Sequence, residues 1–193
     1  MNLIRPVVQN LEKICKGNSV LFNLYAWPYK KTVQREIRLG SITQEDKVLN
    51  IGCGALPFTS YHINRLTGAS IIAVDLDNEA VIEAKNLLSK LKISEEEIFP
   101  VNLAALEAIE KFDFTKVVAA LQTEGKKEIL KAIEKKARRE RNDIQFIVRE
   151  PRSGFTNQYD NISLEKLSNQ KINQAKQKFP TFDRSISIKL GAN

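Results

Sequence analysis

The sequence predicts one α/β domain of the doubly wound class, with a mostly parallel sheet covered by helices on both faces. From position 47 onward, short apolar runs alternate with amphipathic segments of helical period, which is the pattern of repeated strand–helix–strand units. The first apolar run ends in a glycine-rich turn, and the second ends in an acidic residue. A chain of 193 residues is long enough to bury a core around such a sheet.

Five apolar runs are expected to form the parallel part of the sheet. They are Lys47–Ile51, Ser70–Val74, Ile98–Val101, Lys116–Leu121 and Ile144–Val148. Each is short and largely apolar, as strands buried on both faces require. A doubly wound connection gives them the order 3-2-1-4-5. The alternating segment Ser185–Leu190 is expected to add one edge strand in an antiparallel direction.

The helices follow from apolar positions spaced three and four residues apart. They are expected at Phe58–Leu66, Asn78–Leu91, Leu103–Ile109, Lys126–Arg139 and Leu164–Phe179. In the second of these helices the buried face is predicted to contain Ala80, Ile82, Ala84, Leu87, Leu88 and Leu91. The stretch 149–161, which is rich in glycine, proline, asparagine and charge, is expected to be a loop.

Residues 1–40 are predicted to form a short N-terminal helical extension ahead of a domain that spans residues 41–193. Apolar residues from Ile4 to Cys15 keep helical spacing until Gly17 and Asn18 interrupt it. A second helix is expected to start near Ser19. A third is expected to run from Pro28 to Gly40, since proline suits the first turn of a helix.

Bulk properties exclude several classes of protein. No run approaches the roughly 20 apolar residues of a membrane helix, and the first residues lack the apolar core of a secretion signal. The two cysteines have no metal-binding spacing. We therefore expect a soluble, cytoplasmic protein without a metal site or a membrane contact.

The basic charge allows two interpretations. The net charge is +7, and the densest cluster is the segment 135–141 at the end of an expected helix. Such a cluster is either a solvated face that complements the helix dipole or a nucleic-acid surface. No aromatic residue interleaves with it to stack on bases. Nucleic acid is therefore not the expected partner, and a homodimer is left open.

The stretch from Val48 to Pro57 carries the clearest functional signal. An apolar strand runs into Gly52-Cys53-Gly54 and then into the start of a helix. Gly52 permits a tight turn, and Gly54 lets the backbone approach a ligand closely. The helix start offers free N–H groups to a carboxylate or phosphate. Cys53 is interpreted as a small residue that fits the turn, rather than as a nucleophile.

An acidic residue about 20 positions later, at the end of the next strand, is the second half of an adenosine-binding signature. Asp75 fits this place, because it closes the run Ile71–Val74. A carboxylate there can accept both hydroxyl groups of a ribose. Asp77 either shares this role or caps the following helix. His62, the single histidine, is interpreted as a surface or core residue.

The type of adenosine ligand is narrowed by what the turn lacks. Pro57 replaces the third glycine of a dinucleotide fingerprint, and the lysine of a phosphate-binding loop is missing. A G-x-G turn followed by an acid after the second strand resembles the class I S-adenosylmethionine-dependent methyltransferases, which have a Rossmann-like fold. The resemblance implies that the turn holds the methionine part, the acid holds the ribose, and a residue after the third strand touches the adenine. Asn102 is the candidate for that contact, or it caps the helix 103–109.

A closer resemblance, over roughly residues 28–162, is to the nicotianamine synthase family. The segment Gly52–Ser60 is similar to that family's G-x-G-x-L-P-x-T-[SG] turn, and Asp75–Asp77 is similar to its acid–x–acid segment. Weaker similarities are found at Pro28, Tyr29, Glu36, Val117–Leu121, Ile147–Arg149, Gly154 and Tyr159. The resemblance implies donor contacts from Gly52, Cys53, Gly54, Ala55, Leu56, Pro57, Asp75, Leu76, Asp77, Asn102 and Ala119.

That family moves a 3-amino-3-carboxypropyl group from S-adenosylmethionine to an amine and releases methylthioadenosine. The resemblance implies the same reaction with a small-molecule acceptor, and it makes Tyr29 the active-site tyrosine. The alternative for Tyr29 is an aromatic residue packed at a helix start, and Tyr25 and Trp27 either line the pocket mouth or pack likewise. The family also carries a longer N-terminal helical region with a catalytic glutamate, whose position Glu12 does not match.

Several functions therefore stay open at the level of sequence. The leading one is aminocarboxypropyl transfer to a small amine. The others are methyl transfer to a small molecule, methyl transfer to RNA, and binding of S-adenosylmethionine without catalysis. The N-terminal region differs from that of the family, and this difference agrees with three cases. The protein is a relative with another acceptor, it depends on a partner, or it is inactive.

Overall fold

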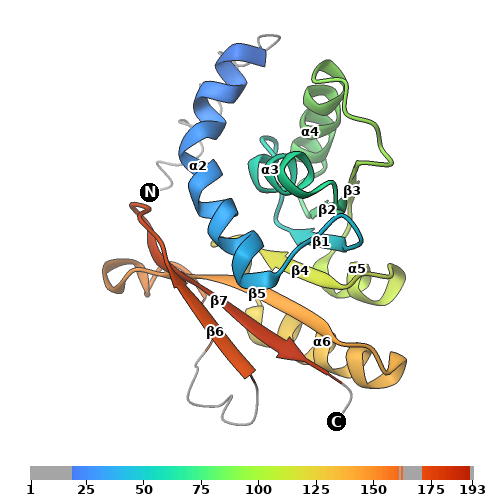
Figure 1. Ribbon diagram of the computed structural model, residues 1–193, viewed down its shortest axis with the longest axis vertical. Helices are drawn as coiled ribbons and strands as arrows, with labels where there is room; N and C mark the ends of the chain where they lie inside the picture. Colours follow the sequence, from blue (N-terminus) through green and yellow to red (C-terminus); the bar gives the residue numbers. More distant parts are fainter. Residues whose placement is uncertain (1–18, 161, 163–170, 192–193) are drawn as a thin grey trace.

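The computed structural model describes residues 19–160, 162 and 171–191. A sheet of seven strands, in the order β3-β2-β1-β4-β5-β7-β6, forms the middle layer (Figure 1). Its strands are β1 (Lys47–Ile51), β2 (Ser70–Asp75), β3 (Ile98–Asn102), β4 (Lys116–Ala119), β5 (Ile144–Pro151), β6 (Lys171–Lys176) and β7 (Phe182–Leu190). The predicted order 3-2-1-4-5 is confirmed, and the antiparallel direction of the last strand is confirmed as well.

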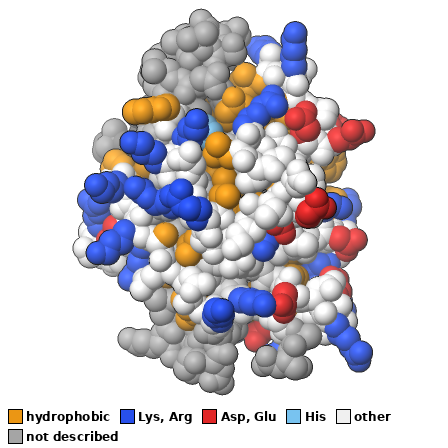
Figure 2. All heavy atoms as spheres, in the orientation of Figure 1, with side chains coloured by type: hydrophobic (Ala, Val, Ile, Leu, Met, Phe, Trp, Pro, Cys, Tyr) orange, Lys and Arg blue, Asp and Glu red, His pale blue; other side chains and the backbone are white. Residues whose placement is uncertain are grey.

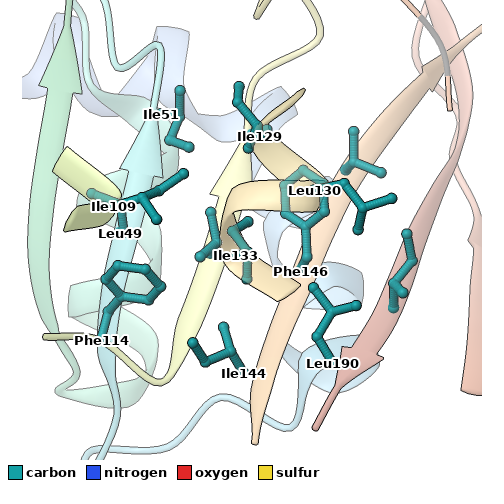
Figure 3. Packing of buried hydrophobic residues seen from close by; sticks show 14 of the residues in the cluster. Leu49, Ile51, Ile109, Phe114, Ile129, Leu130, Ile133, Ile144, Phe146 and Leu190 are labelled. Carbon is teal, nitrogen blue, oxygen red and sulfur yellow. The ribbon is translucent and has the colours of Figure 1, made fainter. Parts of the chain in front are cut away.

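Helices cover both faces of the sheet. They are α2 (Ser19–Gly40), α3 (Phe58–Thr67), α4 (Asn78–Lys90), α5 (Ala105–Lys111) and α6 (Lys126–Glu140). One face packs against α2, α3 and α4, through a cluster that joins Val33, Ile63 and Leu88 to strand residues. The other face packs against α5 and α6 (Figure 3). The doubly wound α/β class is thus confirmed.

The cluster on the α5–α6 face shows why the strands are apolar throughout. Leu49, Phe146 and Leu190 come from three different strands, and Ile109 and Ile133 come from α5 and α6 (Figure 3). Because the strands between the sheet edges are covered on both faces, the side chains that point to either face of the sheet are buried. Burial of each such side chain contributes roughly 1.5–3 kcal/mol.

Two predictions about helices at the ends of the chain were wrong. Instead of a new helix at Pro28, one helix runs from Ser19 to Gly40, and its residues after Pro28 pack against α3 and the sheet. Residues 171–176, predicted as part of the helix Leu164–Phe179, form β6, which pairs with β7. The free backbone edge of β7 outweighs the weak local helical pattern. The predicted helix over 4–15 and the residues 164–170 lie outside the described residues.

Smaller differences have equally local causes. Residues 149–151 were expected in a loop, but β5 continues to Pro151 because β7 pairs with it along this length. The sheet therefore gains two strands beyond β5, not one. The face that α4 buries consists of Val81, Ala84 and Leu88, whereas Ile82, predicted to be buried, is 50% exposed. No helix in the described part of the chain has the length and apolar character to cross a bilayer.

Candidate functional site

The glycine-rich turn lies where β1 ends and α3 begins. Gly52 and Gly54 have φ angles of +76° and +63°, which side chains other than glycine rarely adopt. The backbone N–H groups of Gly52 and Cys53 both donate to the carbonyl oxygen of Val74, at 2.8 and 3.1 Å. A Cβ atom on Gly54 would meet nothing within 4 Å. The turn is therefore fastened to β2 on one side and open above Gly54 on the other.

Asp75 closes this turn. Its Oδ2 atom accepts a hydrogen bond from Gly54 N at 2.8 Å, and its Oδ1 atom accepts one from Asp77 N at 3.0 Å. Each carboxylate oxygen keeps further lone pairs, and the side chain is only half-buried. The carboxylate is thus held rigidly at the carboxyl ends of β1 and β2 and can still accept two hydroxyl groups.

Asp77 serves as the N-cap of α4. Its Oδ1 atom accepts hydrogen bonds from Glu79 N at 2.9 Å and from Ala80 N at 3.3 Å. This is the capping geometry that the sequence left as one of two alternatives. Leu76, between the two acids, is 77% exposed, so the turn presents an apolar side chain beside two carboxylates.

Asn102 ties β3 to the end of β2. Its Nδ2 atom donates to the carbonyl oxygens of Asp75 and Leu76, at 3.0 and 2.9 Å. It is not the cap of the next helix, because Ala104 occupies the N-cap of α5. Leu76, Asn102 and the Asp75 carboxylate thus lie together at one end of the sheet.

The remaining residues of the predicted site contribute mainly to packing. Ala119 lies directly beside Ile51 in the sheet and is fully buried in the cluster on the α5–α6 face. Ala55 and Pro57 are buried, and Leu56 is half-buried. Burial, with the nearby Asp75 charge, raises the pKa of the Cys53 thiol to about 12. Cys53 is therefore a thiol at neutral pH, which agrees with a space-filling role.

Tyr29, on α2, contacts the start of α3. Its ring stacks on Phe58, the first residue of α3, with centroids 5.3 Å apart, and contacts Phe179 at 4.8 Å. Burial raises the pKa of the Tyr29 phenol, and the nearby Arg149 charge partly opposes this effect. The side chain is therefore a neutral phenol at physiological pH. Trp27, on the same helix, is 62% exposed.

Sequence reasoning missed Phe179 as a neighbour of Tyr29. The residue follows β6, in a stretch predicted to be helical, and Phe182 of β7 stacks on it at 4.8 Å. Nothing in the local pattern places residue 179 next to residue 29, because the contact depends on how β6 and β7 add to the sheet. The three rings and Phe58 form one aromatic group between α2, α3 and β7.

A buried ion pair lies on the same side of the sheet. Arg149 donates from Nε and Nη2 to the two carboxylate oxygens of Glu36, both at 2.8 Å. The Nη2 atom also donates to Thr59 Oγ1 at 2.9 Å, and Ser185 Oγ donates to Glu36 Oε1 at 2.8 Å. Glu36, Arg149, Thr59 and Ser185, together called the Glu36 network below, are all buried. Sequence resemblance singled out Glu36 and Arg149 but did not predict that they pair.

Three basic residues of the cluster on α6 form ion pairs, two within the helix and one with α5. Lys136 binds Glu140 at 2.8 Å, Arg138 binds Glu134 at 2.8 Å, and Arg139 binds Glu110 at 2.7 Å. On the face seen in Figure 2, Lys and Arg side chains gather instead over α2 and the turn between β6 and β7. His62 is buried on α3. Among residues 19–160, 162 and 171–191, no three His, Cys, Asp or Glu side chains form a metal-binding group.

Comparison with known proteins supports a relationship in sequence over part of the chain. No protein-family model matches the sequence. An L-histidine 2-aminobutanoyltransferase of Yersinia pestis is 32% identical over 82 residues, which are 42% of this chain and 31% of that protein. The match thus spans about a third of the length of this curated relative.

Solved structures resemble the chain over nearly its whole length. A mutant of MtNAS in complex with S-adenosylmethionine has a TM-score of 0.74 at 14% identity, over 96% of this chain and 72% of that chain. MtNAS in complex with MTA and tNA gives 0.74 at 14% identity, over 96% and 69%. A SAM-dependent O-methyltransferase of Thermotoga maritima gives 0.61 at 12% identity, over 84% and 66%. The fold is that of the class I methyltransferases.

Proposed function

We propose that the protein is a transferase that binds S-adenosylmethionine at the glycine-rich turn and moves its 3-amino-3-carboxypropyl group to a small amine. The observation that carries this proposal is the closed arrangement of Gly54 and Asp75 at the carboxyl ends of β1 and β2. In doubly wound sheets, ligands bind outside this edge.

Each part of the donor has a chemically suitable partner in this proposal. The Asp75 carboxylate accepts the two ribose hydroxyl groups. Leu76 offers an exposed apolar surface to the adenine, and Asn102 holds the segment that carries it. The first turn of α3 and the open space above Gly54 accept the methionine carboxylate, because a helix N-terminus favours a negative charge.

The choice of the transferred group rests on the relatives. The curated relative is named for transfer of an aminobutanoyl group to L-histidine, and the 3-amino-3-carboxypropyl group has the same four-carbon amino-acid skeleton. MtNAS, which shares the fold, is solved with both S-adenosylmethionine and MTA. The acceptor nitrogen forms a bond to the methylene carbon next to the sulfonium. The carbon–sulfur bond breaks with its electron pair on sulfur, and methylthioadenosine leaves as a neutral thioether.

Tyr29 is the residue proposed to face the acceptor amine. Since its phenol is protonated at neutral pH, it acts as a hydrogen-bond partner that orients the amine, not as a phenolate base. Positioning of this kind can supply several kcal/mol of barrier reduction. The acceptor's proton passes to solvent or to a further base as the nitrogen–carbon bond forms.

Calorimetric titration tests the binding step. S-adenosylmethionine, methylthioadenosine and S-adenosylhomocysteine are titrated into the wild type, Asp75→Ala and Asp113→Ala, the last being a control acid that is exposed and remote from the turn. We expect micromolar binding by the wild type and the control, and a loss of at least about 100-fold in Asp75→Ala, since two charge-assisted hydrogen bonds are removed. No heat with any of the three compounds in the wild type would refute the proposal.

Product analysis tests the transferred group. Incubation with S-adenosylmethionine and L-histidine or other small amines should release methylthioadenosine. Release of S-adenosylhomocysteine would show methyl transfer instead, which the likeness to an O-methyltransferase fold makes the second candidate. Tight binding without either product would mark a binding protein.

A further inference from the structure

The Glu36 network joins the two halves of the proposed site. Glu36 belongs to α2, Arg149 to β5, Thr59 to the first turn of α3 and Ser185 to β7. Thr59 lies one residue after Phe58, on which Tyr29 stacks. The helix that carries Tyr29 is therefore tied to the turn that follows Gly54 by two independent contacts, one aromatic and one polar.

Helix geometry links Glu36 to Tyr29. The two residues are seven positions apart in α2, which is close to two full turns, so both side chains lie on the same face of the helix. This face packs against α3 and against the sheet at β5 (Figure 1). Any rotation or sliding of α2 that breaks the Glu36 contacts also displaces the Tyr29 ring.

A buried ion pair is a weak source of net stability. Apolar side chains of similar volume commonly replace a buried ion pair without loss of stability. What an arginine–carboxylate pair adds is direction, because the two parallel hydrogen bonds fix both partners in one plane. Here Arg149 has a third fixed contact, its Nη2 atom donating to Thr59 Oγ1 at 2.9 Å.

Polar contacts of Gln177 and Asn50 support the residues around the network. Gln177, after β6, donates to Ser185 Oγ at 3.0 Å and to the carbonyl oxygen of Thr32 in α2 at 3.4 Å. On the other side of Thr59, Asn50 of β1 donates to Ser60 Oγ at 2.8 Å. The first turn of α3 is therefore held by side chains of β1 and β5, and α2 is held by the same arginine.

We infer that Glu36 and Arg149 are positioning residues that set the place of Tyr29 relative to the donor-binding turn through Thr59. This inference rests on the proposed function for its catalytic consequence, but the placement of α2 is a property of the free protein. Neither residue touches the substrates. The network acts through Tyr29 and through the first turn of α3.

The most selective perturbation is Thr59→Val, which keeps the shape of the side chain and removes the hydroxyl group that Arg149 contacts. Thr59→Ser restores the hydroxyl group and should restore the wild-type behaviour. Thr67→Val is the matched control, because it makes the same change at the opposite end of α3, where the hydroxyl group donates to Ile63 O and accepts from Ala69 N.

Hydrogen exchange measures the placement of α2 without any ligand. In Thr59→Val, the amides of residues 29–40 should exchange about fivefold faster than in the wild type, an effect that matches one lost hydrogen bond. Thr59→Ser and Thr67→Val should leave exchange in α2 unchanged. Unchanged exchange of α2 in Thr59→Val would overturn the inference, whether or not the protein binds S-adenosylmethionine.

A double-mutant cycle tests the catalytic consequence. Thr59→Val should lower kcat about tenfold, the effect of a small displacement of a positioned group. Tyr29→Phe should then cost much less in the Thr59→Val background than in the wild type, since the two residues act in series. Independent, additive effects would overturn the inference. Calorimetry tests separately whether the wild type binds S-adenosylmethionine, and a failure to bind would refute the proposed function. The hydrogen-exchange result would still decide whether the network places α2.

Discussion

The pH dependence of stability should carry the signature of one buried lysine. Lys126, in the first turn of α6, is fully buried, and its Nζ atom donates to the carbonyl oxygens of Leu121, Arg149 and Asp160, at 2.9, 3.4 and 2.6 Å. Burial lowers the pKa of its ammonium group from 10.5 to about 8, although the charges of Glu150 and Asp160 act in the opposite direction.

The sign and size of the effect follow from this pKa. Below pH 8 the amine is charged in both the folded and the unfolded protein, and above pH 10.5 it is neutral in both. Between these values the unfolded protein holds the additional proton, so the free energy of unfolding rises with pH. At 1.36 kcal/mol per pH unit, the fall in pKa from 10.5 to about 8 corresponds to about 3 kcal/mol, most of it gained by pH 10.

This contribution is measured by urea unfolding between pH 7 and pH 10. The proteins compared are the wild type, Lys126→Met and Lys127→Met. Lys127 is an exposed neighbour on the same helix. Lys127→Met is therefore the control, because it keeps Lys126 and every other titrating group of the wild type. The unfolding free energy of the wild type and of Lys127→Met should rise by about 2.5 kcal/mol relative to that of Lys126→Met over this range. Parallel pH profiles for all three proteins would refute the reasoning.

Three further outcomes follow from the site. Gly52→Ala should destabilise the protein by roughly 1–2 kcal/mol in urea unfolding, because φ is +76° and the new Cβ would lie 3.1 Å from Thr123 Oγ1; equal stability with the wild type would contradict the turn geometry. Asp77→Ala should lower the free energy of unfolding by about 1 kcal/mol through loss of the α4 cap, and it should keep the affinity for S-adenosylmethionine within a few fold of the wild type. A loss of affinity as large as that of Asp75→Ala would instead indicate that Asp77 binds the ribose. In a Cys15→Ala background, Cys53 should resist Ellman's reagent at pH 8 until the protein is unfolded, since its thiol is buried with a pKa of about 12; rapid labelling of the native protein would argue against this.

The central sheet could be predicted because each strand is identified by its own residues. Lys47–Ile51 and Ser70–Asp75 are short apolar runs with a glycine turn and an acid at their ends, and the doubly wound rule orders them without further information. The contact of Gly54 with Asp75 could be expected for the same reason, because both residues lie at the carboxyl ends of neighbouring parallel strands.

The parts that could not be predicted depend on contacts distant in sequence. Lys171–Lys176 has a weak local preference, and its pairing with β7 decides its conformation. The neighbourhood of Tyr29 includes Phe179 only because that pairing brings the two residues together. The role of Asp77 was left between two alternatives, since a cap and a ribose contact need the same residue type at the same position.

The Glu36 network also has a consequence for the order of events during synthesis. Glu36 is made early, but Arg149 and Ser185 follow 113 and 149 residues later. At 5–20 residues per second, the ribosome needs roughly 7–30 s to reach Ser185 after Glu36. During this time α2 must wait with an unpaired carboxylate on the face that will be buried. Completion of the Glu36 network is therefore a late step, whereas the packing of α2 against α3 needs only residues made soon after α2 itself.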